Sequence, residues 1–222
     1  MSKYLNVFNT LAEYQAFSAS TEYVQPNVAL VKETNVLYYD YGNNKPKVDM
    51  SDYKVETEEI SVGGNKYGKE AITKINYIPN GIASLQGAFG GFTSLVSVLE
   101  IPSSVTNINS TFIGCTSLIN APEIPNSVTD MTYTFQGCTS LINAPMIPSS
   151  VTNMNNTFRN CTSLKEVTFL HTTPPTYRNT LSGCSKLETI YVPDSAVSAY
   201  KTATGWSQFA SKIKPLSSKP TE

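Results

Sequence analysis

Apolar and polar residues recur along this 222-residue chain with a period of 23 residues. The four cysteines are each 23 positions apart, and the aromatic Phe92 stands one period before the first of them. A phenylalanine, an Ile-Pro pair and a Thr-Ser-Leu phrase keep the same spacing over roughly half the chain. The columns are Cys115, Cys138, Cys161 and Cys184; Phe89, Phe112, Phe135 and Phe158; and Ile78, Ile101, Ile124 and Ile147. A fixed short period predicts units that bury their apolar faces by stacking on copies of themselves.

Within one copy the apolar residues lie three or four positions apart, which at first suggests a helix. Pro122 and Pro125, together with the high Ser, Thr and Asn content, would break a continuous helix. The pattern instead favours a coil that turns at Ile-Pro and at Gly-Cys-Thr and has a short extended segment on one side. Stacked coils would repeat at about 4.8 Å, the spacing between strands, so that five coils form a stack about 25 Å long. The five coils begin at Ile72, Leu95, Leu118, Leu141 and Leu164.

The repeated phrases Phe-x-Gly-Cys-Thr-Ser-Leu and Ile-Pro-x-Ser-Val-Thr-x-Met resemble those of the BspA-like leucine-rich repeats, over about residues 72–215. The resemblance implies a C-terminal cap made of a last strand at 190–193, a short helix at 196–201 and a segment that carries Trp206. A cap is also expected physically, because a terminal coil must cover its apolar face. The residues expected to provide this cover are Ala196, Tyr200, Trp206, Phe209 and Ile213. The copy at 164–186 has Leu170–Pro175 where Ile-Pro-x-Ser-Val is expected, which suggests a transition to the cap.

Residues 1–70 lie outside the repeat. Residues 10–17 predict a short helix, which Thr10 and Glu13 open as a capping box. The extended runs at 27–31 and 36–41 predict a hairpin, and residues 42–46 predict a linker. With the aromatic residues Phe8, Tyr14 and Phe17 followed by residues 23–28, this segment resembles the N-termini of virion proteins of phages that infect gut Bacteroidales.

The fold class expected is a leucine-rich-repeat solenoid of short strands and irregular coils, with a small α+β N-terminal segment and a helical C-terminal cap. The expected domains are residues 1–70 for docking or capping, residues 71–186 for about five coils, and residues 187–222 for the cap and a flexible tail.

Charge changes along the chain. Residues 1–70 carry 7 Lys/Arg and 10 Asp/Glu, residues 71–163 carry 2 and 3, and residues 164–222 carry 7 and 4. The repeats are therefore nearly uncharged, and their Ser, Thr and Asn residues predict a neutral polar surface. The lack of basic clusters argues against nucleic acid as a partner.

No stretch reaches the length of a membrane-spanning helix. The first residues have no apolar run that could form a signal-peptide core, so we expect the chain to stay in the cytoplasm or to leave it in a larger particle.

No catalytic constellation is evident. The cysteines are expected to be free buried thiols; disulfides between coils remain an alternative, and metal binding a weaker one, since neither His nor a second Cys stands near any of them. We expect His171 at the surface, the acidic cluster Glu56, Glu58 and Glu59 at a solvated strand edge, and Gly63-Gly64 in a turn. The column Asn107, Asp130 and Asn153 predicts a ladder that binds backbone groups of the coils. No cofactor is expected.

Residues that vary while the repeat is kept are the candidates for binding. Their columns contain Tyr133 and Asn156, Gln136 and Arg159, and Glu123 and Met146. Tyr and Arg are frequent anchors of recognition surfaces. Neutral variation on an exposed face is the alternative.

The function expected is structural or binding rather than enzymatic. The first hypothesis is a phage virion surface component (a head or tail fibre or a decoration protein), whose N-terminal segment docks or forms a homo-oligomer, with a trimer as one form. Its solenoid would present a face for a host-cell protein or a glycan. The alternative is a bacterial cell-surface adhesin of the BspA-like type. An enzyme with an accessory repeat is the third hypothesis, and residues 1–70 are too small and too poor in catalytic groups to favour it.

Overall fold

The computed structural model describes residues 73–78 and 83–220, together with six strands before them. These strands are β1 (Tyr4–Phe8), β2 (Asn27–Val31), β3 (Val36–Asp40), β4 (Lys47–Val48), β5 (Glu59–Val62) and β6 (Asn65–Gly68). Strands β2 and β3 pair antiparallel, which confirms the hairpin predicted for these runs. Strands β5 and β6 also pair antiparallel, with Val62 opposite Asn65, and the glycine pair between them, Gly63-Gly64, lies outside the described residues. The helix predicted at 10–17, the linker at 42–46, and Glu56 and Glu58 lie outside the described residues.

The N-terminal sheet is hydrogen-bonded to the first coil. Strand β1 pairs parallel with both β2 and β7 (Lys74–Tyr77), and β7 pairs parallel with β8 (Ser97–Val98). The result is one six-stranded sheet in the order β4-β3-β2-β1-β7-β8. A second sheet, in the order β12-β11-β10-β9, contains β9 (Asn143–Ile147), β10 (Glu166–Phe169), β11 (Thr189–Val192) and β12 (Ile213–Pro215). Between the two sheets, the isolated parallel bridge from Asn120 to Asn143 continues the pairing, whereas the other isolated bridges join the column of Ser84, Asn107, Asp130 and Asn153.

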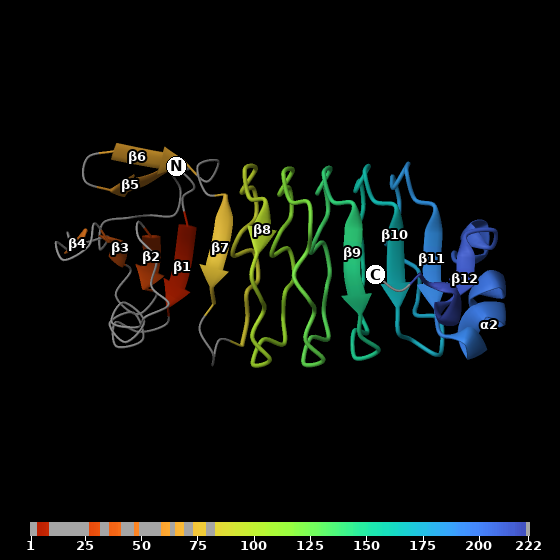
Figure 1. Cartoon of the computed structure of the whole chain (residues 1–222). Coiled ribbons are helices and arrows are strands. Elements are labelled where there is room, and N and C mark those ends of the chain that lie inside the picture. Colours follow the sequence, from red (N-terminus) through yellow and green to blue (C-terminus); the bar gives the residue numbers. More distant parts are fainter. Residues whose placement is uncertain are drawn as a thin grey trace.

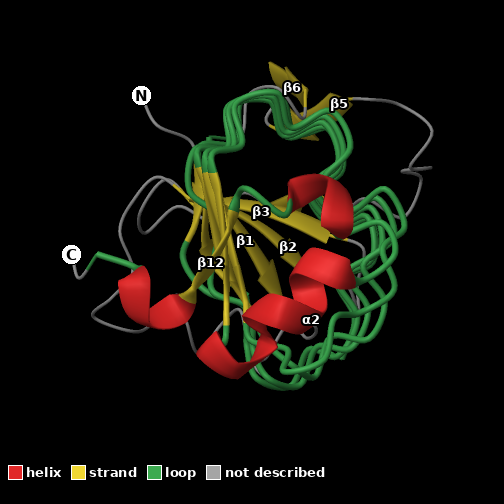
Figure 2. Cartoon of the chain, turned by 90° about the vertical axis from the view of Figure 1, so that its right-hand side faces the viewer, coloured by secondary structure: helices red, strands yellow, loops and turns green. Residues whose placement is uncertain are grey.

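The coils lie side by side along the chain, each with its strand segment in front (Figure 1). Seen along the stack, the strands line one side of the cross-section and turns line the opposite side (Figure 2). Backbone hydrogen bonds join each coil to the next on the turn side. The N–H groups of Phe112, Phe135 and Phe158 donate at 3.0 Å or less to carbonyls of the following coil, which belong to Thr134, Thr157 and Thr180. The chain forms turns, bridges and short strands over residues 83–188, and it forms no helix there.

The core is made of columns, each formed by the same position of successive coils. The phenylalanines stack ring on ring, with centroids 5.7, 5.4 and 5.5 Å apart from Phe89 through Phe112 and Phe135 to Phe158. All four cysteines are free and buried, which confirms the prediction for them. Each Sγ–H donates to the carbonyl of the phenylalanine 26 positions earlier, as Cys138 does to Phe112 at 3.2 Å.

The sequence suggested that the polar residues of the repeat form its surface, but one column of threonines lies in the core. Thr111, Thr134, Thr157 and Thr180 are fully buried. The hydroxyl of Thr134 donates to the carbonyl of Ile108 at 2.9 Å, and the other three make the equivalent bond to the carbonyl 26 positions earlier. A buried hydroxyl that bonds to backbone loses little on leaving water, so this column can lie in the core.

Two positions of each coil adopt the left-handed conformation. One is the glycine of the Gly-Cys-Thr phrase, with φ of 71° at Gly114 and 75° at Gly137, while Asn160 takes this place in its coil with φ of 61°. Glycine and asparagine tolerate this conformation best, which explains why the chain can turn at this corner. The second position is the column of Gly87, Ser110, Tyr133, Asn156 and Asn179.

The predicted cap is present at the C-terminus. After β11 come a 3-10 turn (Asp194–Ala196), helix α2 (Val197–Thr202), a second 3-10 turn (Ser207–Phe209), β12 and a third 3-10 turn (Leu216–Ser218). Ala196, Tyr200, Trp206 and Ile213 are buried, and Phe209 is partly buried against them. The indole N–H of Trp206 donates to the carbonyl of Pro175 at 2.6 Å, which ties the cap to the last coil.

Candidate binding surfaces

The coils present two long surfaces. The strand side contains residues 96–101, 119–124 and 142–147 with the strands that follow them, and the turn side contains residues 107–115, 130–138 and 153–161. The six candidate residues do not gather on one surface. Glu123 and Met146 lie on the strand side, whereas Tyr133, Gln136, Asn156 and Arg159 lie on the turn side.

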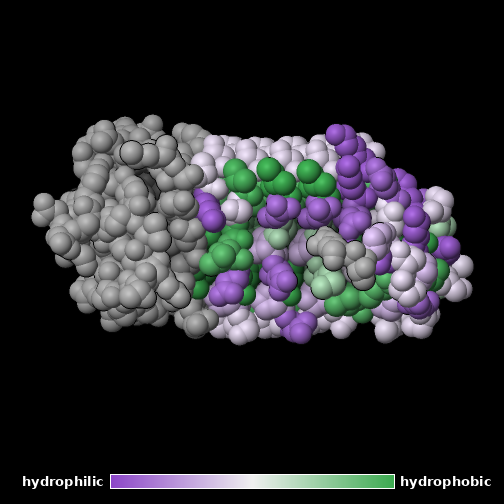
Figure 3. All heavy atoms as spheres, in the orientation of Figure 1, coloured by the Kyte–Doolittle hydropathy of each residue, from purple (hydrophilic) through white to green (hydrophobic). Residues whose placement is uncertain are grey.

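Exposed hydrophobic side chains gather on the strand side. Of the six large hydrophobic residues exposed in the described part of the chain, five lie there, and Leu99 and Met146 are the most exposed at 67% and 56%. The other three stack directly over one another, because Ile119 N–H donates to Val96 and Ile142 N–H donates to Ile119. Figure 3 shows hydrophobic side chains in a row across successive coils on this face.

This surface is also acidic. Residues 79–158 contain neither Lys nor Arg, and Glu100 and Glu123 are exposed on the strand side. Among the described residues, neither carboxylate forms an ion pair. Asn120 and Asn143 add exposed amides beside the hydrophobic row. The strand side of these coils therefore combines apolar contact area with negative charge.

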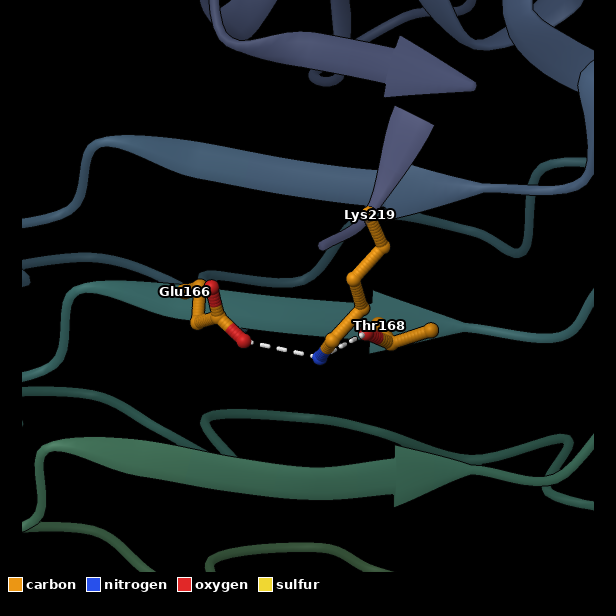
Figure 4. A network of polar contacts seen from close by, with 3 residues as sticks. All are labelled: Glu166, Thr168 and Lys219. Carbon is orange, nitrogen blue, oxygen red and sulfur yellow. Dashed lines mark hydrogen bonds and ion pairs between the residues drawn. The ribbon is translucent and has the colours of Figure 1, made fainter. Parts of the chain in front are cut away.

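The chain's own C-terminal segment covers the continuation of this surface. We call Leu216–Lys219 the tail segment. The Lys219 Nζ donates to Glu166 Oε1 at 2.7 Å and to Thr168 Oγ1 at 3.3 Å, across the outer face of β10 (Figure 4). The same ammonium lies 5.3 Å from the centroid of the Tyr191 ring. The Ser217 N–H donates to Asp194 Oδ1 at 3.0 Å. Hydrogen bonds from the side chain and from the backbone of Ser217 lower the pKa of the exposed Asp194 carboxyl below its usual value.

The turn side presents a different surface. Tyr133 and Arg159 are exposed, whereas Gln136 and Asn156 are half-buried. Tyr133 has φ of 56°, a conformation that is unfavourable for a bulky side chain, and Asn156 in the next coil has φ of 54°. The column Asn107, Asp130 and Asn153 lies beside them and binds backbone, as predicted, since Asp130 Oδ1 accepts from the Thr132 N–H at 2.7 Å.

The thiols do not provide chemistry. Burial raises the pKa of Cys115 to about 12 and that of Cys184 to about 11, and it also raises the pKa of Cys138 and Cys161. A neutral thiol is neither a nucleophile nor a metal ligand at neutral pH. The described residues contain no group of His, Cys, Asp and Glu that could hold a metal ion. Cys184 borders a shallow hollow at the last coil, with Tyr177, Asn179 and Phe209.

The expectation that His171 lies at the surface is wrong. Its side chain is 8% exposed, and its Nε2 donates to the carbonyl of Val151 at 2.7 Å. The pairing of β9 with β10 explains why His171 is buried. A bulge shifts the register of the two strands, so that Phe169 pairs with Ile147 and Leu170 follows it at the corner of the coil. The copy at 164–186 lacks the valine that the other copies have at this corner, and His171 lies beside Val151 of the preceding coil.

The repeat and the coils agree with comparisons to known proteins. A family model described as the BspA type leucine rich repeat region matches six copies, over residues 61–188 and 131–210. No curated protein matches the sequence. Within the described residues, no helix is both long and apolar enough to cross a membrane.

Two solved structures are similar to this chain. One is a leucine rich cell surface protein from Faecalibacterium prausnitzii A2-165, with a TM-score of 0.53 and 23% identity over 92% of this chain and 52% of that one. Another is a leucine-rich repeat protein from Bacteroides ovatus ATCC 8483, with a TM-score of 0.46 and 23% identity over 78% of this chain and 47% of that one. This chain thus spans about half the length of each. The first similarity supports the leucine-rich-repeat fold, and neither supports the resemblance of residues 1–70 to phage virion proteins.

Proposed function

The chain belongs to the BspA-type leucine-rich-repeat family, and from this premise we propose that it is a non-enzymatic binding protein of the bacterial cell surface. Its coils form a short solenoid, and the strand side of that solenoid binds a protein partner. We adopt the bacterial alternative rather than the phage virion hypothesis, because a similar structure with a TM-score of 0.53 is described as a leucine rich cell surface protein from a bacterium.

The observation that carries the proposal is the set of exposed hydrophobic residues on the strand side, which consists of Leu99, Met146 and the stacked row of Val96, Ile119 and Ile142. Large hydrophobic residues exposed singly are common on protein surfaces, whereas a contiguous group is typical of an interaction site. Here five such residues lie within three adjacent coils, and two of them are more than half exposed. The buried columns behind them hold the strand side rigid, so little order has to be gained when a partner binds.

A binding role also agrees with the chemistry of the described residues. The thiols are neutral and buried, His171 is enclosed between coils, and the acidic residues of the strand side have no basic neighbour in residues 79–158. The expected oligomer, with residues 1–70 as its docking segment, stays a prediction that sedimentation of the full chain would test.

The proposal is tested by adhesion of coated beads. Beads that carry the full chain are applied to mammalian cell monolayers, and the adhering beads are counted. A strand-side variant, Leu99→Ser with Met146→Ser, is compared with a turn-side variant, Tyr133→Ser with Arg159→Ser. Each variant changes two exposed side chains, so neither opens a cavity in the core. Circular dichroism verifies that both fold.

We expect adhesion of the wild-type beads and a loss of about tenfold in the strand-side variant, since removal of central apolar contacts costs about 1–2 kcal/mol of binding. The turn-side variant should adhere like the wild type. A loss in the turn-side variant alone would assign binding to Tyr133 and Arg159, a surface better suited to a glycan, and would overturn the proposal. Wild-type beads that do not adhere would overturn it as well. Antibody labelling of intact producing cells tests the location, and labelling only after permeabilisation would contradict it.

A further inference from the structure

Beyond the hydrophobic row, the strand side continues onto β10 and β11, where the tail segment of the chain lies over it. In β9, Met146 is exposed, whereas Thr168, the residue paired with it in β10, is only 2% exposed. Tyr191, which pairs with Thr168 in β11, is buried as well. Both residues lie on the outer face of the sheet, where the Lys219 side chain of the tail segment reaches them, as Figure 4 shows for Thr168.

The contacts of the tail segment define the chemistry that this face accepts. A lysine ammonium reaches a glutamate and a hydroxyl of β10 and lies over an aromatic ring of β11. The carboxylate and the ammonium are each about one-third exposed, so that the bond is partly screened by water and mainly fixes where the segment lies. The apolar residue of the tail segment, Leu216, is half-buried.

The uncovered coils offer the same combination one to three coils earlier. Glu100 and Glu123 supply the carboxylates, and Leu99, Met146 and the row of Val96, Ile119 and Ile142 supply the apolar surface. Residues 79–158 contain neither lysine nor arginine, and the lysine of the neighbouring strand β7, Lys74, pairs with Ser97. A partner that brings its own cation and apolar side chains would therefore match this surface in charge and in polarity.

We propose that the strand side of residues 96–147 binds a short, lysine-bearing segment of a protein partner, in the manner in which the tail segment, a 3-10 turn followed by Lys219, covers β10 and β11. The apolar side chains of the partner lie over Leu99, Met146 and the hydrophobic row, and its lysines bind Glu100 and Glu123. This inference rests on the proposed function and specifies the class of partner.

The test uses the tail's own sequence as the probe. A fluorescein-labelled peptide with the sequence of residues 211–220, which contains three lysines, is titrated with the full chain, and its anisotropy is followed. We expect saturable binding that weakens about tenfold when the three lysines are replaced by glutamine, and about tenfold in the double variant Glu100→Gln with Glu123→Gln. Both glutamates are exposed, so their replacement should leave the fold intact.

A matched control separates this surface from the tail's own site. Glu166→Gln removes the carboxylate that Lys219 binds and leaves Glu100 and Glu123 unchanged. Peptide binding should persist in this variant. Binding that is lost in Glu166→Gln, or that is unchanged in the Glu100 and Glu123 variant, would overturn the inference, as would the absence of saturable binding to the wild type.

The outcomes also distinguish this inference from the proposed function. If bead adhesion is lost in the Leu99 and Met146 variant but kept in the Glu100 and Glu123 variant, the strand side binds through apolar contacts alone. The lysine inference then fails and the proposed function stands. If adhesion is unaffected by any strand-side change, the proposed function itself fails, whatever the peptide does.

Discussion

The stacked phenylalanines can be tested by comparing how much stability the chain loses when each of them is replaced by leucine. Phe112 and Phe135 each stack on two rings, at centroid distances of 5.4–5.7 Å, whereas Phe158 stacks on one. The column continues after Phe158 with Leu181, which has no ring. Replacement of each phenylalanine by leucine deletes the same atoms from an equally buried site, since all three side chains have no exposed area.

The expected magnitudes follow from this count. The common part, from lost apolar contact and a small residual cavity, is about 1–2 kcal/mol for each variant. Each stacked pair adds about 0.5–1.5 kcal/mol beyond the buried area. Phe112→Leu and Phe135→Leu lose two pairs and Phe158→Leu loses one. The first two variants should therefore be less stable than the third by about 0.5–1.5 kcal/mol.

Urea unfolding measures the difference. Far-UV circular dichroism reports on the coils and Trp206 fluorescence on the cap, and coincidence of the two curves shows whether the stack unfolds as one unit. The double variant Phe112→Leu with Phe135→Leu should lose less than the sum of the single losses, because the two residues share a pair. A Phe158→Leu variant as unstable as Phe135→Leu would refute the reasoning, because the stacking would then contribute nothing beyond burial.

Three further predictions follow from the core, the turn side and the cap. Because burial raises the pKa of Cys115 and Cys184 above the ordinary value of 9.0, the unfolded chain loses thiol protons first as pH rises, so the free energy of unfolding should fall above pH 9. Replacing these two cysteines by alanine should make the slope shallower in urea titrations from pH 7 to about 10.5, while Cys138 and Cys161, whose pKa burial also raises, keep part of it; an unchanged slope would contradict the prediction. Tyr133→Asn should raise the free energy of unfolding by about 1 kcal/mol, because asparagine tolerates the left-handed conformation that Tyr133 adopts; lower stability in urea would show that its ring contributes more than the strain. Trp206→Phe should lower stability by about 2–4 kcal/mol in thermal unfolding, because it loses the bond to Pro175 and leaves a gap in the cap; a variant as stable as the wild type would mean that the cap does not hold the last coil.

The sequence by itself determined the repeated unit and its core. A residue that recurs every 23 positions must occupy the same place in every coil, so the columns of Phe135 and Cys138 could be assigned to the interior without coordinates. The prolines excluded a helix, and the terminal aromatic residues indicated a cap. The glycine at the Gly-Cys-Thr corner also followed, because its conformational freedom is what that corner requires.

Only the tertiary structure decided which residues share a surface and which are covered. An irregular coil has no fixed angle per residue, so spacing could not show that Met146 and Tyr133 lie on different sides. Nor could it place Thr134 and His171 in the interior, because their burial depends on a carbonyl that an earlier coil presents to them. The contact of Lys219 with Glu166, 53 residues away, depends on the tail folding back over the sheet. Exposure in a stack of coils is set by what the next coil or the tail lays over a residue, and that is a property of the folded chain.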